Sequence, residues 1–173
     1  MTRLVLLAIL ALVLSACGFQ LRDAIQLPAD LGPLRVVAPD PYSPLAESLS
    51  QALTRAGAVA AADAASKDVA TLQIVSEHWG ATPLSIDAFG RAQEYTLRYA
   101  VIFDMERADG SVVVPQQAIE LSRDYVTDAA RSLGTASEQE LLGNELRREM
   151  VASILRRIDA ASRAPVPALN PAP

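Results

Sequence analysis

The chain has little of the chemistry that catalysis and metal binding require. Its 173 residues include one histidine, one cysteine and one tryptophan. A zinc site needs several nitrogen, sulfur or carboxylate ligands, and His78 is the only imidazole, so we expect it to be a surface or rim residue. The sequence also lacks a Gly-x-Ser-x-Gly turn, a glycine-rich loop followed by lysine, and an Asp-x-Asp-x-Asp-Gly loop. We therefore predict a protein that binds rather than an enzyme, with no metal or nucleotide cofactor.

Positive charge and long apolar runs are also scarce. There are 15 basic against 20 acidic residues, for a net charge of −5. Nucleic-acid binding depends on neutralising phosphates with Lys and Arg, so this balance argues against a nucleic-acid partner. The apolar run from Leu4 to Leu14 is too short to cross a bilayer, which takes roughly 20 residues.

That short run has the features of a cleaved signal peptide. Arg3 precedes it, and Ser15, Ala16 and Cys17 follow it. A small-residue site that ends at a cysteine is the pattern of a lipobox, where the thiol receives a diacylglycerol and the chain is cut in front of it. We expect residues 1–16 to be removed and Cys17 to carry a covalent lipid, which leaves no thiol for a disulfide. Gly18, rather than an aspartate, comes next, which favours the outer membrane over the inner one.

The rest of the chain predicts one domain between two irregular segments. Residues 17–33 are expected to form a tether and residues 34–163 a single domain. Residues 164–173 contain four prolines and are expected to be extended and disordered. Runs of strand-forming residues cover 34–38, 69–79, 95–104 and 112–126. A loop is expected over 58–68.

Two helices complete the predicted domain. Ser43 and Pro44 suit the start of the first helix, and Gly57 suits its end. The second is expected to start at the Ser137–Glu140 capping box and to bury a leucine, methionine and isoleucine stripe. The order β-α-β-β-β-α predicts an α+β two-layer sandwich, with a four-stranded, mostly antiparallel sheet and two helices on one face. Pro115 indicates an edge strand or a bulge.

Arginines in the joints between strands are the candidate binding residues. Arg91 lies in the turn between the first two long strands, Arg131 in the loop after the third, and Arg123 near the end of that third strand. A guanidinium suits a phosphate because it donates hydrogen bonds in a fixed fork. If Arg91 and Arg131 meet at one end of the sheet, they could hold an anionic group there. Isolated surface arginines are the alternative interpretation.

Several short motifs resemble the LptE family of lipopolysaccharide-assembly lipoproteins. They are spread over nearly the whole mature chain: Cys17-Gly18-Phe19-Gln20-Leu21-Arg22, Ser43-Pro44-Leu45, Glu94-Tyr95 at the start of the central strand, Ser122-Arg123-Asp124-Tyr125, and the final helix from Glu138 to Arg157. The resemblance implies an outer-membrane lipoprotein, anchored on the periplasmic face, that plugs the β-barrel LptD in a one-to-one complex. Together the two proteins would insert lipopolysaccharide into the outer leaflet.

The resemblance also implies that basic residues at one end of the domain bind lipopolysaccharide. Arg91 falls close to one such position. At the second, in the loop before the final helix, this chain departs from the family pattern: Thr135 stands near the place of the expected lysine, with Arg131 four residues earlier. The alternative is a freestanding periplasmic lipoprotein that carries or senses an apolar ligand between sheet and helices.

Overall fold

The computed structural model describes residues 25, 27–28, 30–61, 68–127 and 132–163. The predicted signal peptide, the lipidation residue Cys17, the candidate Arg131 and the proline-rich tail lie outside these residues.

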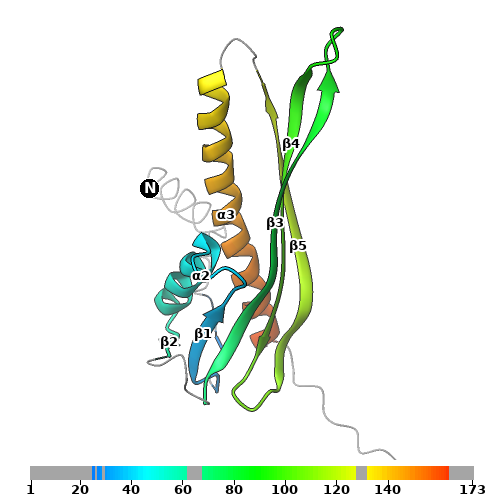
Figure 1. Cartoon of the computed structure of the whole chain (residues 1–173). Helices are drawn as coiled ribbons and strands as arrows, with labels where there is room; N and C mark the ends of the chain where they lie inside the picture. The colour runs from blue at the N-terminus through cyan, green and yellow to red at the C-terminus, as the bar shows by residue number, and fades with distance from the viewer. Residues whose placement is uncertain (1–24, 26, 29, 62–67, 128–131, 164–173) are drawn as a thin grey trace, which may run out of the picture.

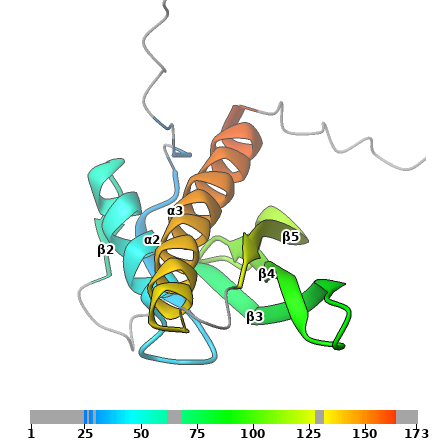
Figure 2. The ribbon, with the colours of Figure 1, turned by 90° about the horizontal axis from the view of Figure 1, so that it is seen from above.

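A single twisted sheet organises the domain, with its strands in the order β2-β1-β3-β4-β5. Strand β1 pairs in parallel with β2 and β3, whereas β3–β4 and β4–β5 are antiparallel. Both helices lie on the same face of the sheet (Figures 1 and 2). The strands are β1 (Pro33–Val37), β2 (Val59–Ala60), β3 (Ala70–Ile86), β4 (Ala92–Glu106) and β5 (Val112–Val126), and the helices are α2 (Pro44–Arg55) and α3 (Ser132–Arg163). The predicted α+β class and helix placement are confirmed.

The sheet has one strand more than predicted. Strand β2 lies in the segment 58–68 that we expected to be a loop, and both of its residues are exposed. Two residues are too few to display the alternation that identifies a strand from sequence. Pairing with β1, rather than burial, holds β2 in place.

Helix α2 has the boundaries that the sequence predicts. The Ser43 side chain accepts a hydrogen bond from the backbone N–H of Ala46, and Pro44 occupies the first helical position. Leu45, Leu49 and Leu53 are buried. Gly57 follows the helix with φ of 97°, a conformation that an L side chain rarely adopts.

Helix α3 begins earlier than predicted, at Ser132 instead of at the Ser137–Glu140 capping box. The Ser-x-x-Glu spacing also fits a helix interior, since residues three apart lie on one face. Both residues are exposed within the helix. Its predicted buried stripe is confirmed from Leu146 onward, because Leu146, Met150, Ile154 and Ile158 have no exposed surface. The stripe was also expected to include Leu141 and Leu142, but Leu142 is half-buried and Leu141 is exposed.

The core fills the layer between sheet and helices. Strand β4 contributes alternate residues, with Tyr99, Val101, Phe103 and Met105 fully buried. Leu31, which we expected in the tether, also belongs to this core, and Ile25 and Leu27 pack against it. The described part of the segment before β1 is therefore packed onto the domain rather than free.

Strand β5 forms one edge of the sheet. Its pairing with β4 shifts register between Phe103 and Met105, opposite the stretch that contains Pro115. A proline cannot donate a ladder hydrogen bond and so belongs at an edge or bulge. Both parts of the Pro115 prediction are confirmed.

Candidate functional site

The β3–β4 hairpin projects beyond the start of α3 and presents Arg91 at its tip (Figure 1). A tight turn connects the strands: the N–H of Asp87 donates to the carbonyl of Arg91 at 2.8 Å, and the N–H of Gly90 donates to the carbonyl of Asp87 at 3.0 Å. Gly90 has φ of 77°, which explains why glycine stands there.

The Asp87 carboxylate organises this turn. It accepts hydrogen bonds from the backbone N–H groups of Phe89 (2.8 Å) and Arg91 (2.9 Å), and from the Gln93 amide. It also accepts one from Arg91 Nε at 2.8 Å. These donors, with the Arg91 backbone N–H foremost, lower the pKa of Asp87 from its ordinary value, although desolvation opposes them. Asp87 is therefore ionised at neutral pH and fixes the direction of the Arg91 side chain.

The outer end of Arg91 remains available to a ligand. Only Nε is used by Asp87, and the terminal nitrogens have no hydrogen-bond partner among the described residues. The guanidinium carbon lies 5.3 Å from the centre of the Phe89 ring, within cation–π range. The tip therefore offers a forked donor backed by an aromatic ring.

Exposed apolar side chains lie on the same hairpin and at the neighbouring end of β5. Leu84, Ile86 and Phe89 are 59%, 68% and 83% exposed, and Val126 at the end of β5 is also exposed. Val126 pairs with Glu94, close to the same end of the sheet. The hairpin end thus combines a guanidinium with apolar surface, which suits an anionic amphiphile better than a simple ion. The sequence pattern did not identify Asp87, Leu84 or Ile86, although an aspartate with a glycine three residues later, as in Asp87-Ala88-Phe89-Gly90, is a turn signal.

Arg123 lies elsewhere and has a structural partner. It pairs in register with Leu97, roughly 20 Å along β4 from the Arg91 turn at about 3.3 Å per residue. Its guanidinium contacts the Glu149 carboxylate of α3 at 2.6 Å. The structure does not bring Arg123 to Arg91, and Arg131 is outside the described residues.

A buried polar network joins three elements below the hairpin. Glu77 on β3 accepts hydrogen bonds from the Tyr99 hydroxyl at 2.7 Å and from the Ser43 hydroxyl at 2.8 Å. The Trp79 ring stacks on Tyr99 with centres 3.8 Å apart. Burial, assisted by Glu77, raises the pKa of Tyr99 well above its ordinary value. The network fixes the start of α2 against the sheet and leaves the hairpin to extend above it.

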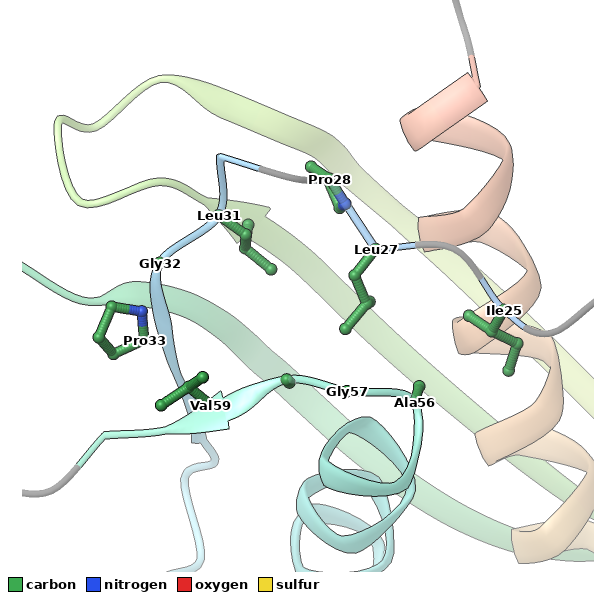
Figure 3. Close-up of a pocket in the computed structure, with 10 residues that line it drawn as sticks. Ile25, Leu27, Pro28, Leu31, Gly32, Pro33, Ala56, Gly57 and Val59 are labelled. Atoms are coloured by element: carbon green, nitrogen blue, oxygen red, sulfur yellow. The ribbon is translucent and has the colours of Figure 1, made fainter.

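One cavity of about 570 Å³ lies apart from the hairpin tip. Across it, Leu27 and Leu31 from the segment before β1 face Ala56 and Gly57, which follow α2, and Val59 of β2 (Figure 3). None of its lining residues comes from strands β3–β5 or helix α3, between which the predicted carrier of an apolar ligand would hold that ligand.

Two further structural findings concern the described residues only. None of their helices is long and apolar enough to cross a membrane. No group of three or more His, Cys, Asp or Glu among them is arranged to hold a metal ion.

Known proteins resemble this chain over most of its length. The sequence model of a family described as LptE, lipopolysaccharide-assembly, matches residues 31–158. The LPS-assembly lipoprotein LptE of Photorhabdus laumondii is 30% identical over 88% of this chain and 82% of its own. The Yersinia pestis protein of the same name is 31% identical over 88% of this chain and 73% of its own.

Solved structures agree with these relatives. An uncharacterised lipoprotein B from Nitrosomonas europaea has a TM-score of 0.69 at 27% identity, over 85% of this chain and 94% of its own. The rare lipoprotein B of Shewanella oneidensis has a TM-score of 0.62 at 29% identity, over 75% of this chain and 95% of its own. From the family match, the relatives and the shared fold, this chain belongs to the LptE family of lipopolysaccharide-assembly lipoproteins.

Proposed function

We propose that this protein is an outer-membrane lipoprotein that plugs the β-barrel LptD and presents its β3–β4 hairpin to lipopolysaccharide during insertion into the outer leaflet. Cys17 would carry the lipid that anchors the protein on the periplasmic face, with no other cofactor. The role is one of binding and not of catalysis. The observation that carries the proposal is the amphiphilic hairpin end, which presents Arg91 beside Phe89 and also exposes Leu84 and Ile86.

The uncovered face of the sheet supports the plug role. Cross-strand polar pairs occupy it: Arg98 contacts Glu120 at 2.6 Å, and the Thr96 hydroxyl donates to Asp124 at 2.6 Å. The interior of a large outer-membrane barrel is polar. A domain with a hydrophilic outer face suits that surrounding, whereas it would not suit lipid.

The tip geometry supports lipopolysaccharide binding. The two free nitrogens of Arg91 can donate to one phosphate, while the exposed apolar side chains contact acyl chains. Because Asp87 balances the charge of Arg91, directed hydrogen bonds and apolar contact must supply the affinity. Long-range attraction contributes little at this end.

Mild detergent extraction of a tagged, lipidated protein tests the plug. We expect one large β-barrel to co-purify at a one-to-one ratio. The Cys17→Ala protein should lose its membrane anchor but still bind the barrel, since the folded domain makes the contacts. Recovery of the lipidated protein alone would overturn the plug role. It would favour the alternative, a freestanding carrier.

Lipopolysaccharide capture tests the hairpin separately. Arg91→Gln should weaken capture several-fold while barrel recovery stays unchanged. Arg107→Gln is the matched control, because Arg107 lies in a similar hydrogen-bonded turn, between β4 and β5. Equal capture by both variants would remove Arg91 from the binding site.

A further inference from the structure

Helices α2 and α3 form a second basic surface, which we name the arginine groove. Two adjoining cavities of about 570 and 750 Å³ run between the helices and share Arg55, Arg148 and Val151. The groove is lined by five arginines in an acidic protein: Arg55, Arg147, Arg148, Arg156 and Arg163. It lies on the helices, away from the hairpin tip.

Most of these arginines have no carboxylate partner. Asp159 is the one acidic side chain lining the groove, and it pairs with Arg163 at 3.1 Å. Arg156 donates to the Ser153 hydroxyl, and Arg148 forms no hydrogen bond or ion pair with any described residue. The groove therefore has a net positive charge that the described residues do not neutralise.

The other two arginines of the groove make only neutral contacts. Arg55 donates to the Gln51 carbonyl, and Arg147 donates to the Asn144 amide oxygen. The Arg147 Nε atom is buried and has no hydrogen-bond partner among the described residues.

Four of the six described arginines outside the groove differ from this, whereas Arg157 contacts the Gln117 amide oxygen. Arg91, Arg98, Arg107 and Arg123 each lie within 3.4 Å of a carboxylate oxygen. Adjacent like charges repel unless an anion lies between them. The unpaired guanidiniums therefore indicate that the groove binds an anion that the described residues do not supply.

The floor of the groove restricts the kind of anion. Ala52, Val151 and Leu155 lie between the arginines. A phosphodiester with a glycerol and methylene groups would use both the guanidinium forks and this apolar floor. Free phosphate would leave the apolar floor uncovered.

The position of the groove indicates where such a lipid comes from. Ile25, the described residue nearest in sequence to Cys17, lines the groove and lies beside α3 (Figure 3). Eight residues span at most roughly 29 Å. If Cys17 is acylated, as the proposed function holds, the groove lies within that reach of the phospholipid surface that holds the anchor.

We propose that the arginine groove binds the phosphodiester headgroups of anionic phospholipids at the anchoring membrane surface. It acts as a second attachment point beside the acyl chains, because a basic patch and a lipid together hold a protein more firmly than either alone. This inference rests on the proposed anchor but does not depend on the barrel or on Arg91.

Vesicle co-flotation of the mature chain, residues 17–173, tests the inference. Cys17→Ala removes the acyl chains, and all described helices and strands lie within this range. The probes are vesicles of phosphatidylcholine alone and vesicles of equal parts phosphatidylcholine and phosphatidylglycerol. The groove variant is Arg148→Glu with Arg156→Glu. The matched control is Arg98→Glu with Arg157→Glu, which makes the same charge change at exposed arginines that do not line the groove.

We expect binding to the phosphatidylglycerol vesicles only, weakened by salt. Each basic residue near an anionic surface contributes about fivefold in affinity, so the groove variant should lose about thirtyfold or more. The control should stay within about twofold. Circular dichroism melts establish that both variants are folded.

Three outcomes would overturn the proposal. The groove variant could bind phosphatidylglycerol as the control does. Lipopolysaccharide micelles could compete the wild type off the vesicles at much lower phosphate concentration, which would assign the groove to lipopolysaccharide. The groove variant of the lipidated protein could lose the co-purifying barrel, which would assign it to an acidic protein segment. Barrel recovery with the wild type reports separately on the plug role.

Discussion

Removal of one buried hydroxyl should measure how firmly α2 is attached to the sheet. Tyr99 is fully buried and donates to Glu77 at 2.7 Å, while Glu77 accepts from the helix-capping Ser43 at 2.8 Å. Tyr99→Phe keeps the ring and its stacking on Trp79, and removes only the hydrogen bond. The structure of the core is otherwise unchanged.

The expected cost follows from the partner. A hydrogen bond to a charged group contributes about 1.5–3 kcal/mol, and Glu77 is half-buried and keeps its bond from Ser43. We therefore expect a loss of about 2 kcal/mol in the free energy of unfolding. At about 2–4 °C per kcal/mol for a chain of this size, Tm falls by roughly 6 °C.

Thermal and urea unfolding, followed by circular dichroism, measure this change. Tyr42→Phe is the matched control, because Tyr42 is 89% exposed and its variant should stay within about 0.5 kcal/mol of the wild type. If the Tyr99 and Tyr42 variants unfold alike, the Tyr99–Glu77 bond contributes no stability. A loss well above 4 kcal/mol would show that the ring had moved, not that one bond was lost.

The same pair of proteins gives a pH test. Burial raises the pKa of Tyr99 in the folded state. The contribution of the neutral Tyr99 to the free energy of unfolding is therefore fully present below the unfolded pKa of about 10. It is lost as the pH rises further, because only the unfolded chain then releases the proton. The stability gap between wild type and Tyr99→Phe should therefore narrow above about pH 10. A gap that stays constant there would contradict the assigned shift.

Three other predictions concern single contacts. The Arg91 N–H and other donors depress the pKa of Asp87. The turn should therefore be fully ordered above the unfolded pKa of about 3.9, and it should loosen as the pH falls through the lower pKa of the folded state. NMR amide exchange at the turn measures this loosening, and Asp87→Asn should produce it at neutral pH. Arg123→Gln should cost no more than about 1 kcal/mol, because both partners are partly exposed, and a double-mutant cycle with Glu149→Gln checks the coupling. Leu146→Ala should cost about 2–5 kcal/mol in urea unfolding, because this fully buried leucine leaves a cavity; a smaller loss would mean that the helix collapses into the space.

Local patterns predicted most of the fold because they coincide with burial. The alternation along β4 and the four-residue spacing of α3 match the buried residues, and Ser43, Pro44 and Gly57 mark the ends of α2 as expected. The patterns failed where tertiary contacts decide the outcome. Pairing with β1 creates β2, and packing against the core orders Leu31 in the expected tether.

The candidate site was less accessible to sequence reasoning. A turn arginine such as Arg91 can be recognised, but its pairing with Asp87 depends on hairpin geometry. Arg123 gave the same signal as Arg91 and instead contacts Glu149 on α3, a partner distant in sequence. The groove arginines resembled an ordinary solvated helix face, because the sequence does not show that α2 lies beside them.

The hairpin tip and the arginine groove differ in whether their arginines have carboxylate partners, and this difference determines the kind of ligand that each surface can select. At the hairpin tip, Asp87 cancels the charge of Arg91, so recognition there depends on hydrogen-bond geometry and on the exposed apolar residues. In the groove, unpaired guanidiniums give a net field that attracts any dense anionic surface and weakens as salt is added. If Cys17 anchors the protein as proposed, a selective tip and a general electrostatic attachment suit two surfaces of one protein, because the surface held at a membrane needs persistence and the surface that meets its ligand needs discrimination.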